Sequence, residues 1–165
     1  MININQFLKL YGTQTTTNFD LKKIANQLGI KNFHILMRDE LQFLKSKPTG
    51  SFSSRNKVPT INFITNLHTS NQKGVHWSAG RKNTDNVENY YFDRLESENY
   101  WFDSYGLPPT NEVKEFLGNG IYNTFQIQKP GTTYCGQLCL YVLLKLQKGV
   151  PFLDIMLELK NNNDN

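Results

Sequence analysis

The sequence predicts an α+β fold, in which a small mixed β-sheet packs against a central buried helix with further helices around it. The first observation is the run 135–146, whose apolar residues recur with helical period on nearly every face, as in a fully buried helix. The second is a set of short segments between residues 58 and 128 that are rich in β-branched and aromatic residues. A chain of 165 residues fits one domain, which we expect over 1–160, with a disordered Asn-rich tail over 161–165.

The N-terminal third predicts two amphipathic helices. Apolar residues at a spacing of three to four predict a short helix over 2–11, and Asn18 is expected to cap a second helix that ends at Gly29. Residues 33–44 are apolar but ambiguous between strand and helix. The segment 45–57 is rich in Pro, Gly, Ser and basic residues, and we expect an exposed loop there.

The rest of the chain predicts the strands and the last helices. Strands are expected over 58–67, 75–79, 87–95, 99–105 and 121–128, of which the third and fourth flank a Glu-Ser-Glu turn. Thr110 is expected to cap a short helix that closes at Gly118. Pro151 opens the final helix, with its inward face formed by Leu153, Met156 and Leu157.

Composition excludes several classes of protein. No apolar run approaches the length that crosses a bilayer, and the start MININQFLKLYG has neither a basic n-region nor a cleavage site of a signal peptide. The 18 basic and 14 acidic residues give a net charge of +4, which permits contact with nucleic acid but does not specify it. Two cysteines four residues apart make neither a disulfide framework nor a zinc site, so we expect no metal and a reducing compartment.

Cys135 is a candidate nucleophile because it opens the buried helix. The positive end of the helix dipole favours the thiolate, and Gly136 lets another chain approach closely. The alternative is a small core residue, since free cysteines are commonly buried.

A histidine and a carboxylate could complete such a site. His76 stands at the start of a β-prone run between Gly74 and Trp77, and a neutral imidazole is a suitable base for a thiol. Asp103 ends an aromatic strand and could orient the imidazole, but Asp93 has nearly the same setting. His34 and His68 are equally available by composition.

Gln128 is a fourth candidate. A side-chain amide shortly before the nucleophile can donate to the oxyanion of a tetrahedral intermediate, together with the Cys135 backbone N–H. Taken alone, Gln128 is better explained as an exposed strand residue.

The order of these residues resembles that of the adenain-like cysteine proteases, which share a clan with the proteases of SUMO and ubiquitin-like modifiers. The match is carried by Gly74-Val75-His76-Trp77, then Phe102-Asp103-Ser104-Tyr105-Gly106-Leu107-Pro108-Pro109, then Gln128, then Cys135-Gly136. The resemblance covers residues 18 to 157. The Asp-Ser-Tyr-Gly-Leu-Pro-Pro stretch is most similar to the enzymes of virophages and polinton-type transposons.

The resemblance implies a papain-like core with adenain-like topology and a role for each residue. Cys135 is then the nucleophile, His76 the general base and acid, and Asp103 the residue that holds the imidazole. Gln128 contributes to the oxyanion hole, and Trp77 lines a narrow substrate groove. The sequence departs from the family pattern in the position of the acidic residue. The usual spacing between histidine and acid in these enzymes indicates Asp93, whereas the fuller match of the local motif indicates Asp103, which we favour.

The function implied is a cysteine endopeptidase that cleaves virion precursor proteins, such as capsid or core proteins, after small Gly-type motifs during maturation. No cofactor is required for the chemistry, but adenain is activated by DNA and by a short precursor-derived peptide, and the basic 45–57 loop is compatible with DNA contact. The expected location is the virion and the host-cell interior at the site of assembly, without membrane contact. Two alternatives are a processing protease or isopeptidase of ubiquitin-like modifiers and a catalytically silent packaged DNA-binding or structural protein.

Overall fold

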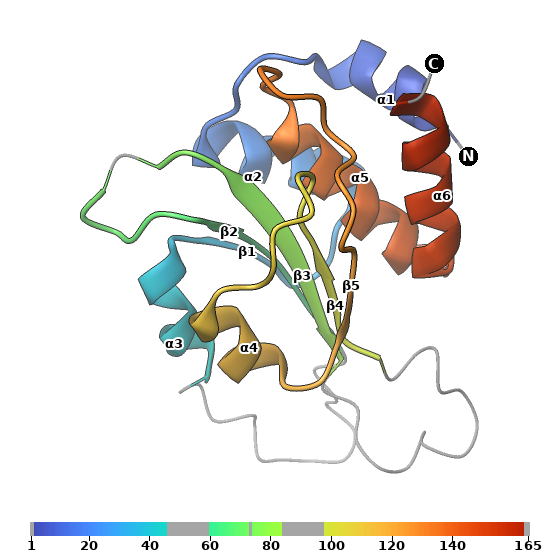
Figure 1. Ribbon diagram of the computed structural model, residues 1–165. Coiled ribbons are helices and arrows are strands. Elements are labelled where there is room, and N and C mark those ends of the chain that lie inside the picture. The colour runs from blue at the N-terminus through green and yellow to red at the C-terminus, as the bar shows by residue number, and fades with distance from the viewer. Residues whose placement is uncertain (1, 46–59, 73, 84–97, 164–165) are drawn as a thin grey trace.

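A five-stranded mixed sheet forms the centre of the protein (Figure 1). The computed structural model describes residues 2–45, 60–72, 74–83 and 98–163. The strands lie in the order β1-β2-β3-β4-β5, with β1 parallel to β2, β4 parallel to β5 and the other two pairs antiparallel. They are β1 (Phe33–Leu36), β2 (Thr60–Asn66), β3 (Trp77–Asn83), β4 (Tyr100–Phe102) and β5 (Ile121–Tyr122).

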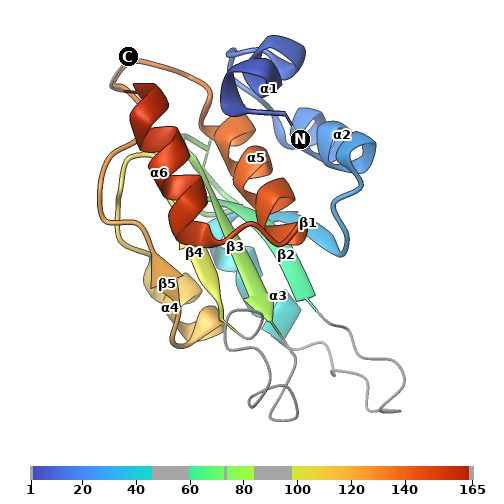
Figure 2. The ribbon, with the colours of Figure 1, turned by 90° about the vertical axis from the view of Figure 1, so that its right-hand side faces the viewer.

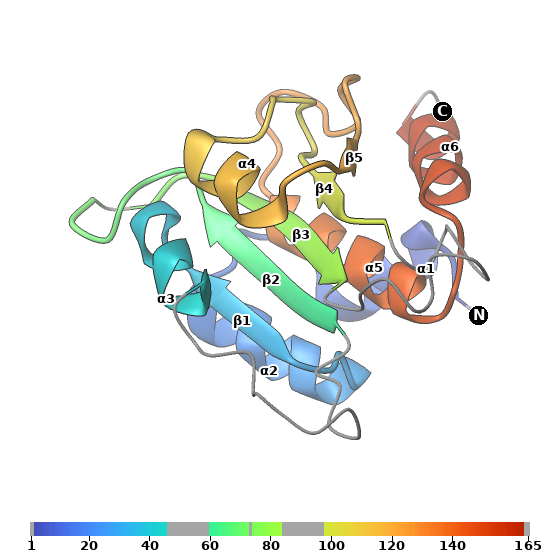
Figure 3. The same ribbon diagram turned by 90° about the horizontal axis from the view of Figure 1, so that it is seen from below.

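Helices cover both faces of this sheet, which confirms the α+β fold class. One face carries the long helix α5 together with α1, α2 and α6, and the other face carries α3 and α4 (Figure 3). The helices are α1 (Ile4–Tyr11), α2 (Asn18–Leu28), the 3₁₀ helix η1 (Arg38–Glu40), α3 (Leu41–Lys45), α4 (Asn111–Leu117), α5 (Cys135–Gln147) and α6 (Phe152–Asn163).

Successive side chains along a strand point to opposite faces of the sheet, so apolar residues on both faces require helices packed against each face. On β2, Phe63 packs into the cluster with α3 and α4, while its neighbour Ile64 packs into the cluster with α5. On β4, Trp101 and Phe102 divide in the same way. The sheet is therefore the middle layer of three.

The central helix α5 is buried on all sides, as its apolar pattern predicts. Every residue from Gly136 to Leu146 is buried, and α5 contacts β3, α1, α2 and α6. Figure 2 shows α6 beside α5, near β4 and β5. Among the described residues no helix is long and apolar enough to cross a membrane.

The ends of two helices follow from capping. The side chain of Thr17 accepts a hydrogen bond from the Asp20 N–H, and the side chain of Asp20 accepts one from the Thr17 N–H. The residue that caps α2 is therefore Thr17 and not the predicted Asn18. Gly29 ends α2 in the left-handed conformation, as predicted. Thr110 and Gly118 end α4, also as predicted.

The predicted inward face of α6 is confirmed for Met156 and wrong for Leu153 and Leu157. Leu153 and Leu157 are exposed, while the core side of α6 is formed by Phe152, Ile155, Met156 and Leu159. This second set also has helical spacing and includes Phe152, whose ring stacks on Tyr100 of β4 at 5.3 Å between centroids. The aromatic contact sets the rotation of the helix. The sequence does not reveal it, because Tyr100 is distant along the chain.

Two other expectations change. The strand predicted over 121–128 is regular only in β5, because the Asn123 side chain turns back to bond the backbone of Asp103 and Phe125. Helix α6 runs on into residues 161–163, which had been assigned to the tail. The predicted strand 87–95 and most of the 45–57 loop lie outside the described residues.

Substitution of Met156 tests the orientation of α6. We expect Met156→Ala to lower the free energy of unfolding by about 2–5 kcal/mol, because its side chain is 2 % exposed in the core. The matched control Leu153→Ala, at a side chain 65 % exposed, should change it by less than about 0.5 kcal/mol. Urea denaturation measures both. Equal losses would contradict the packing described here.

Candidate active site

Three chain segments converge at one end of the sheet. β3 and β4 are antiparallel with Ala79 opposite Phe102, so His76 and Ser78, around the start of β3, lie beside Asp103, which directly follows β4. The N-terminus of α5, which begins at Cys135, packs against β3. The start of β3, the end of β4 and the start of α5 therefore bring His76, Asp103 and Cys135 together.

The buried carboxylate of Asp103 has four hydrogen-bond contacts in this site. Its Oδ2 lies 3.0 Å from His76 Nε2 and accepts a hydrogen bond from the Ser78 hydroxyl at 2.5 Å. Its Oδ1 accepts from the backbone N–H groups of Tyr105 and Leu107 at 2.8 and 3.2 Å. Burial works to raise the pKa of Asp103, but the bonds from His76, Ser78 and Tyr105 outweigh it and hold this pKa below its ordinary value.

The backbone of Asp103 is fixed as firmly as its side chain. Asn123, which is buried, accepts from the Asp103 N–H at 3.1 Å and donates to the Asp103 carbonyl at 2.6 Å. A single amide side chain thus takes the place of a strand partner beyond the end of β5. Asp103 is held there without a regular sheet.

The His76 ring is buried between its partners. Nε2 faces Asp103, so Nδ1 is the nitrogen left for the Cys135 thiol, and Tyr105 stacks on the ring at 4.9 Å between centroids. Burial works to lower the pKa of His76, but hydrogen bonds and charge interactions with Asp103 and Cys135 outweigh it and raise the pKa to about 9.

The pKa of the Cys135 thiol is shifted in the opposite direction to that of His76. Burial works to raise its pKa, but the hydrogen bond to His76, the backbone of Trp77 and Gly136 and the charge of His76 lower it below its ordinary value. Both shifts act in the same sense, toward a thiolate–imidazolium pair. Cys135 is partly exposed, so the thiolate is accessible to a substrate.

Cys139 is one helical turn further along α5 and has the opposite character. It is fully buried, and its thiol donates to the Trp77 carbonyl at 3.4 Å. Burial, followed by the charges of Cys135 and Asp103, raises its pKa well above the ordinary value. Its role is packing.

The loop before His76 is shaped by the side chain of Asn66. Asn66 Oδ1 accepts from the backbone N–H groups of His68 and Val75 at 2.9 and 3.1 Å. The Gly74 N–H donates to His68 Nδ1 at 3.0 Å, and Gly74 has a φ of +89°, which favours glycine. His68 thus supports the loop, while His34 is bonded to Asn32 on the surface.

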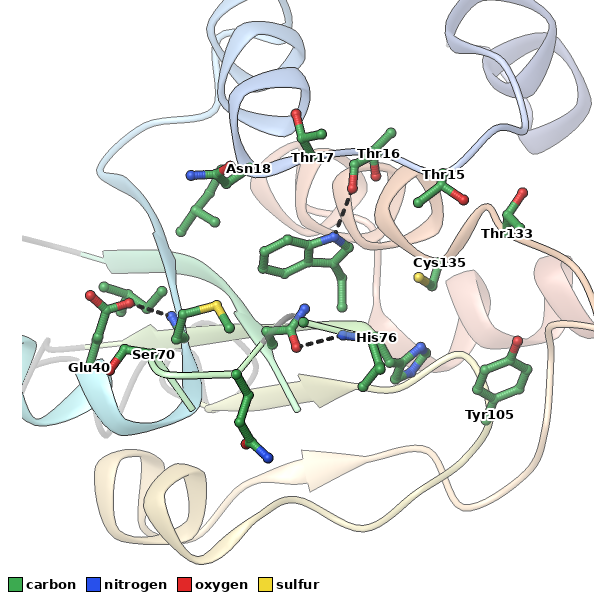
Figure 4. Close-up of a pocket in the computed structure, with 18 of the residues that line it drawn as sticks. Thr15, Thr16, Thr17, Asn18, Glu40, Ser70, His76, Tyr105, Thr133 and Cys135 are labelled. Atoms are coloured by element: carbon green, nitrogen blue, oxygen red, sulfur yellow. Dashed lines mark hydrogen bonds between the residues drawn. The ribbon is translucent and has the colours of Figure 1, made fainter. Parts of the chain in front are cut away.

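A cavity of about 630 Å³ opens in front of Cys135 (Figure 4). Its lining includes Cys135, His76 and Tyr105 at one end and the Trp77 side chain. Residues 15–18 lie on one side, and Ser70, Gln72, Gly74 and Val75 lie on the other. Beyond Trp77 it continues to residues 35–37 and Glu40. The nucleophile candidate therefore lies in an elongated groove that can receive an extended peptide.

One wall of the groove is held by side chains from β3, from α5 and from the segment just before α5. Thr133, Gln137 and Trp77 donate hydrogen bonds to the carbonyls of Thr13, Gln14 and Thr16, at 2.6, 2.8 and 3.1 Å respectively. A Cβ on Gly136 would lie 2.2 Å from Thr16 Oγ1, so the close approach of this wall to α5 requires glycine at 136.

Gln128 is buried just behind the groove. Its Nε2 donates to the Thr132 carbonyl at 2.9 Å, and its Oε1 accepts from the Ser104 hydroxyl at 2.6 Å. A carbonyl can only accept, so these partners determine which end of the amide faces Thr132. Thr132 lines the cavity, whereas Gln128 does not. The role of Gln128 in an oxyanion hole stays a prediction.

The structure brings His76, Asp103 and Cys135 into one network and places Trp77 in the groove wall. Asp93, the alternative acid, lies outside the described residues. Within the described ranges no group of His, Cys, Asp and Glu side chains could hold a metal ion.

Ser78 and Asn123 also bond Asp103, and neither of them is predicted from the sequence. Ser78 lies two residues after His76, a spacing that predicts a shared side of the strand, whereas nothing local indicates Asn123.

No protein-family model matches the chain, and no curated protein matches it.

The alkylation rate of Cys135 tests the ion pair. We expect iodoacetamide to modify Cys135 already at neutral and mildly acidic pH. His76→Gln should lower the rate at about pH 6.5 by about tenfold, because loss of the hydrogen bond and charge of His76 raises the thiol pKa and so lowers the fraction of thiolate. Mass spectrometry of the labelled peptides measures the rate. Cys139→Ala is the control and should leave the profile unchanged. A profile that does not respond to His76→Gln would contradict the pairing.

Proposed function

We propose that the protein is a cysteine peptidase. The observation that supports this best is the chain of contacts from the partly exposed Cys135 through His76 to the buried Asp103, at the end of a groove. The thiol has a lowered pKa, the imidazole a raised one, and the carboxylate is held by further donors. These are the properties that an activated nucleophile, its acid–base partner and an orienting group require.

The proposed reaction is hydrolysis of a peptide bond through a thioester. The Cys135 thiolate attacks the carbonyl carbon, and the C–N bond breaks as His76 gives its proton to the leaving amine. Water, deprotonated by His76, then attacks the thioester and releases the acid and the thiol. Asp103 keeps the ring oriented and stabilises its charged form.

The oxyanion of each tetrahedral intermediate needs donors at the start of α5. The backbone N–H of Cys135 is in the first turn of the helix, where N–H groups have no intrahelical acceptor. We assign the second donor to Gln128, whose Nε2 uses one hydrogen for the Thr132 carbonyl and has another to offer.

The motif order further supports an adenain-like enzyme that matures virion precursor proteins by cutting after small Gly-type residues. Trp77 lines the groove beside the nucleophile, and a narrow passage there favours residues without a side chain. Activation by DNA or by a precursor-derived peptide, and action inside the virion and host cell, belong to the same proposal. Ubiquitin- or SUMO-aldehyde probes distinguish this enzyme from a protease of modifiers, because only the latter should be captured.

Replacement of the nucleophile tests the proposal directly. Wild type is co-expressed with candidate capsid proteins that carry Gly-Gly or Gly-x sites, and the products are read by intact mass. Cys135→Ala should abolish cleavage without unfolding, whereas the matched variant Cys139→Ala should retain it and cost only about 1–2 kcal/mol of stability. If nothing is cut, the experiment is repeated with DNA and precursor-derived peptides. Cleavage that survives Cys135→Ala would overturn the assignment.

A comparison of two aspartates tests the third member of the triad. Asp103→Asn should reduce kcat by several orders of magnitude, because an amide no longer stabilises the charged imidazole. Asp93→Asn should leave kcat within a factor of about two to three of wild type. Steady-state kinetics on one cleaved peptide measures both. The reverse ranking would move the role to Asp93.

A further inference from the structure

The groove ends, away from Cys135, at a carboxylate that the proposed chemistry does not use. Figure 4 shows Cys135 and His76 toward one end of the cavity and Glu40, from the 3₁₀ helix η1, toward the other. Glu40 lines the same continuous cavity as the nucleophile. A peptide extended along the groove would therefore bring a side chain some residues away from the cleaved bond to Glu40.

The Glu40 carboxylate is oriented and still has binding capacity. Its Oε1 accepts a hydrogen bond from the Met37 N–H at 2.7 Å, which fixes the side chain at the start of η1. Among the described residues Oε2 has no hydrogen-bond partner, and the residue is half-buried. An acceptor that is already oriented loses little conformational entropy when it binds a ligand.

Within the described part of the chain, Glu40 forms no salt bridge. Among the described residues that line the cavity there is no lysine or arginine. The adjacent Arg38 is paired with Glu112. Asp39 differs from Glu40, because both its oxygens accept from Ser70, at 2.7 and 2.6 Å, and it does not line the cavity.

Part of the lining near Glu40 is apolar. Ile35, Leu36 and Met37 line the cavity together with Glu40, and the polar residue Ser70 lies on its other side (Figure 4). An apolar wall that ends in a carboxylate is complementary to a side chain with a long aliphatic stem and a cationic head. Lysine and arginine have this form, whereas an acidic side chain would be repelled and a leucine would leave the carboxylate unpaired.

We propose that Glu40 is a specificity-determining residue that selects substrates carrying lysine or arginine at one fixed position on the far side of Trp77 from the cleaved bond. The aliphatic stem lies on the apolar wall, and the head donates to Glu40 Oε2. This inference rests on the proposed peptidase function and defines its substrate class more closely. A charge-assisted hydrogen bond in a partly buried site predicts a preference of about tenfold or more over a neutral residue.

Peptide profiling with charge variants tests this proposal. The probes are peptides of one sequence containing a Gly-Gly pair, in which Lys, Leu or Glu is placed at each position in turn. Wild type, Glu40→Gln, Glu40→Lys and the control Asp39→Asn are compared by mass spectrometry. Wild type should cleave peptides with Lys at one position about tenfold faster, Glu40→Gln should lose this preference, and Glu40→Lys should prefer Glu there. Asp39→Asn should behave as wild type.

Two results would overturn the inference while leaving the peptidase function in place. One is cleavage with a preference for Leu, or with none, at every position. The other is a Lys preference that survives Glu40→Lys. If wild type cuts no peptide even with DNA and precursor-derived peptides present, the peptidase proposal fails. Binding of the Lys and Glu peptides to Cys135→Ala, with and without Glu40→Lys, then decides the charge selection on its own: tighter binding of the Lys peptide that reverses with Glu40→Lys supports it, and equal binding contradicts it.

Discussion

The contact between the buried Asp103 carboxylate and the His76 imidazole constrains the rest of the site. A charged carboxylate away from water is costly unless donors surround it. Here the imidazole, a hydroxyl and two backbone N–H groups meet that need. The first two come from the start of β3 and the other two from the turn after β4, so satisfying this one group fixes the start of β3, the end of β4 and the turn that follows.

The same constraint extends to the thiol through the histidine. With Nε2 committed to Asp103, the ring presents Nδ1 to Cys135, and the raised pKa of His76 and the lowered pKa of Cys135 are two sides of one interaction. The fold makes this geometry rigid because Cys135 opens a helix that is buried between the sheet and three other helices. The groove is shaped by the same elements, since side chains beside Cys135 hold the wall formed by residues 13–17.

The sequence predicts those features that depend on local pattern. The burial of α5, the caps of α4 and the stop of α2 at Gly29 each follow from spacing or from one residue type, and the motif around Asp103 favours it over Asp93. Features that depend on distant partners are not predictable in this way. The rotation of α6 follows from Phe152 stacking on Tyr100, the early end of β5 from Asn123 bonding Asp103, and the far end of the groove from Glu40 facing the same cavity as Cys135.

The central claim is that His76 is a charged imidazolium held between Asp103 and the Cys135 thiolate. An NMR titration of the His76 ring measures this most directly, with the ring signals assigned by comparison with a His76→Gln sample. The structure predicts a titration midpoint of about 9, because the hydrogen bonds and negative charges of Asp103 and Cys135 outweigh the burial of the ring. A midpoint at or below the ordinary value of 6.5 would show that burial dominates, and it would contradict the ion pair on which the proposed chemistry depends.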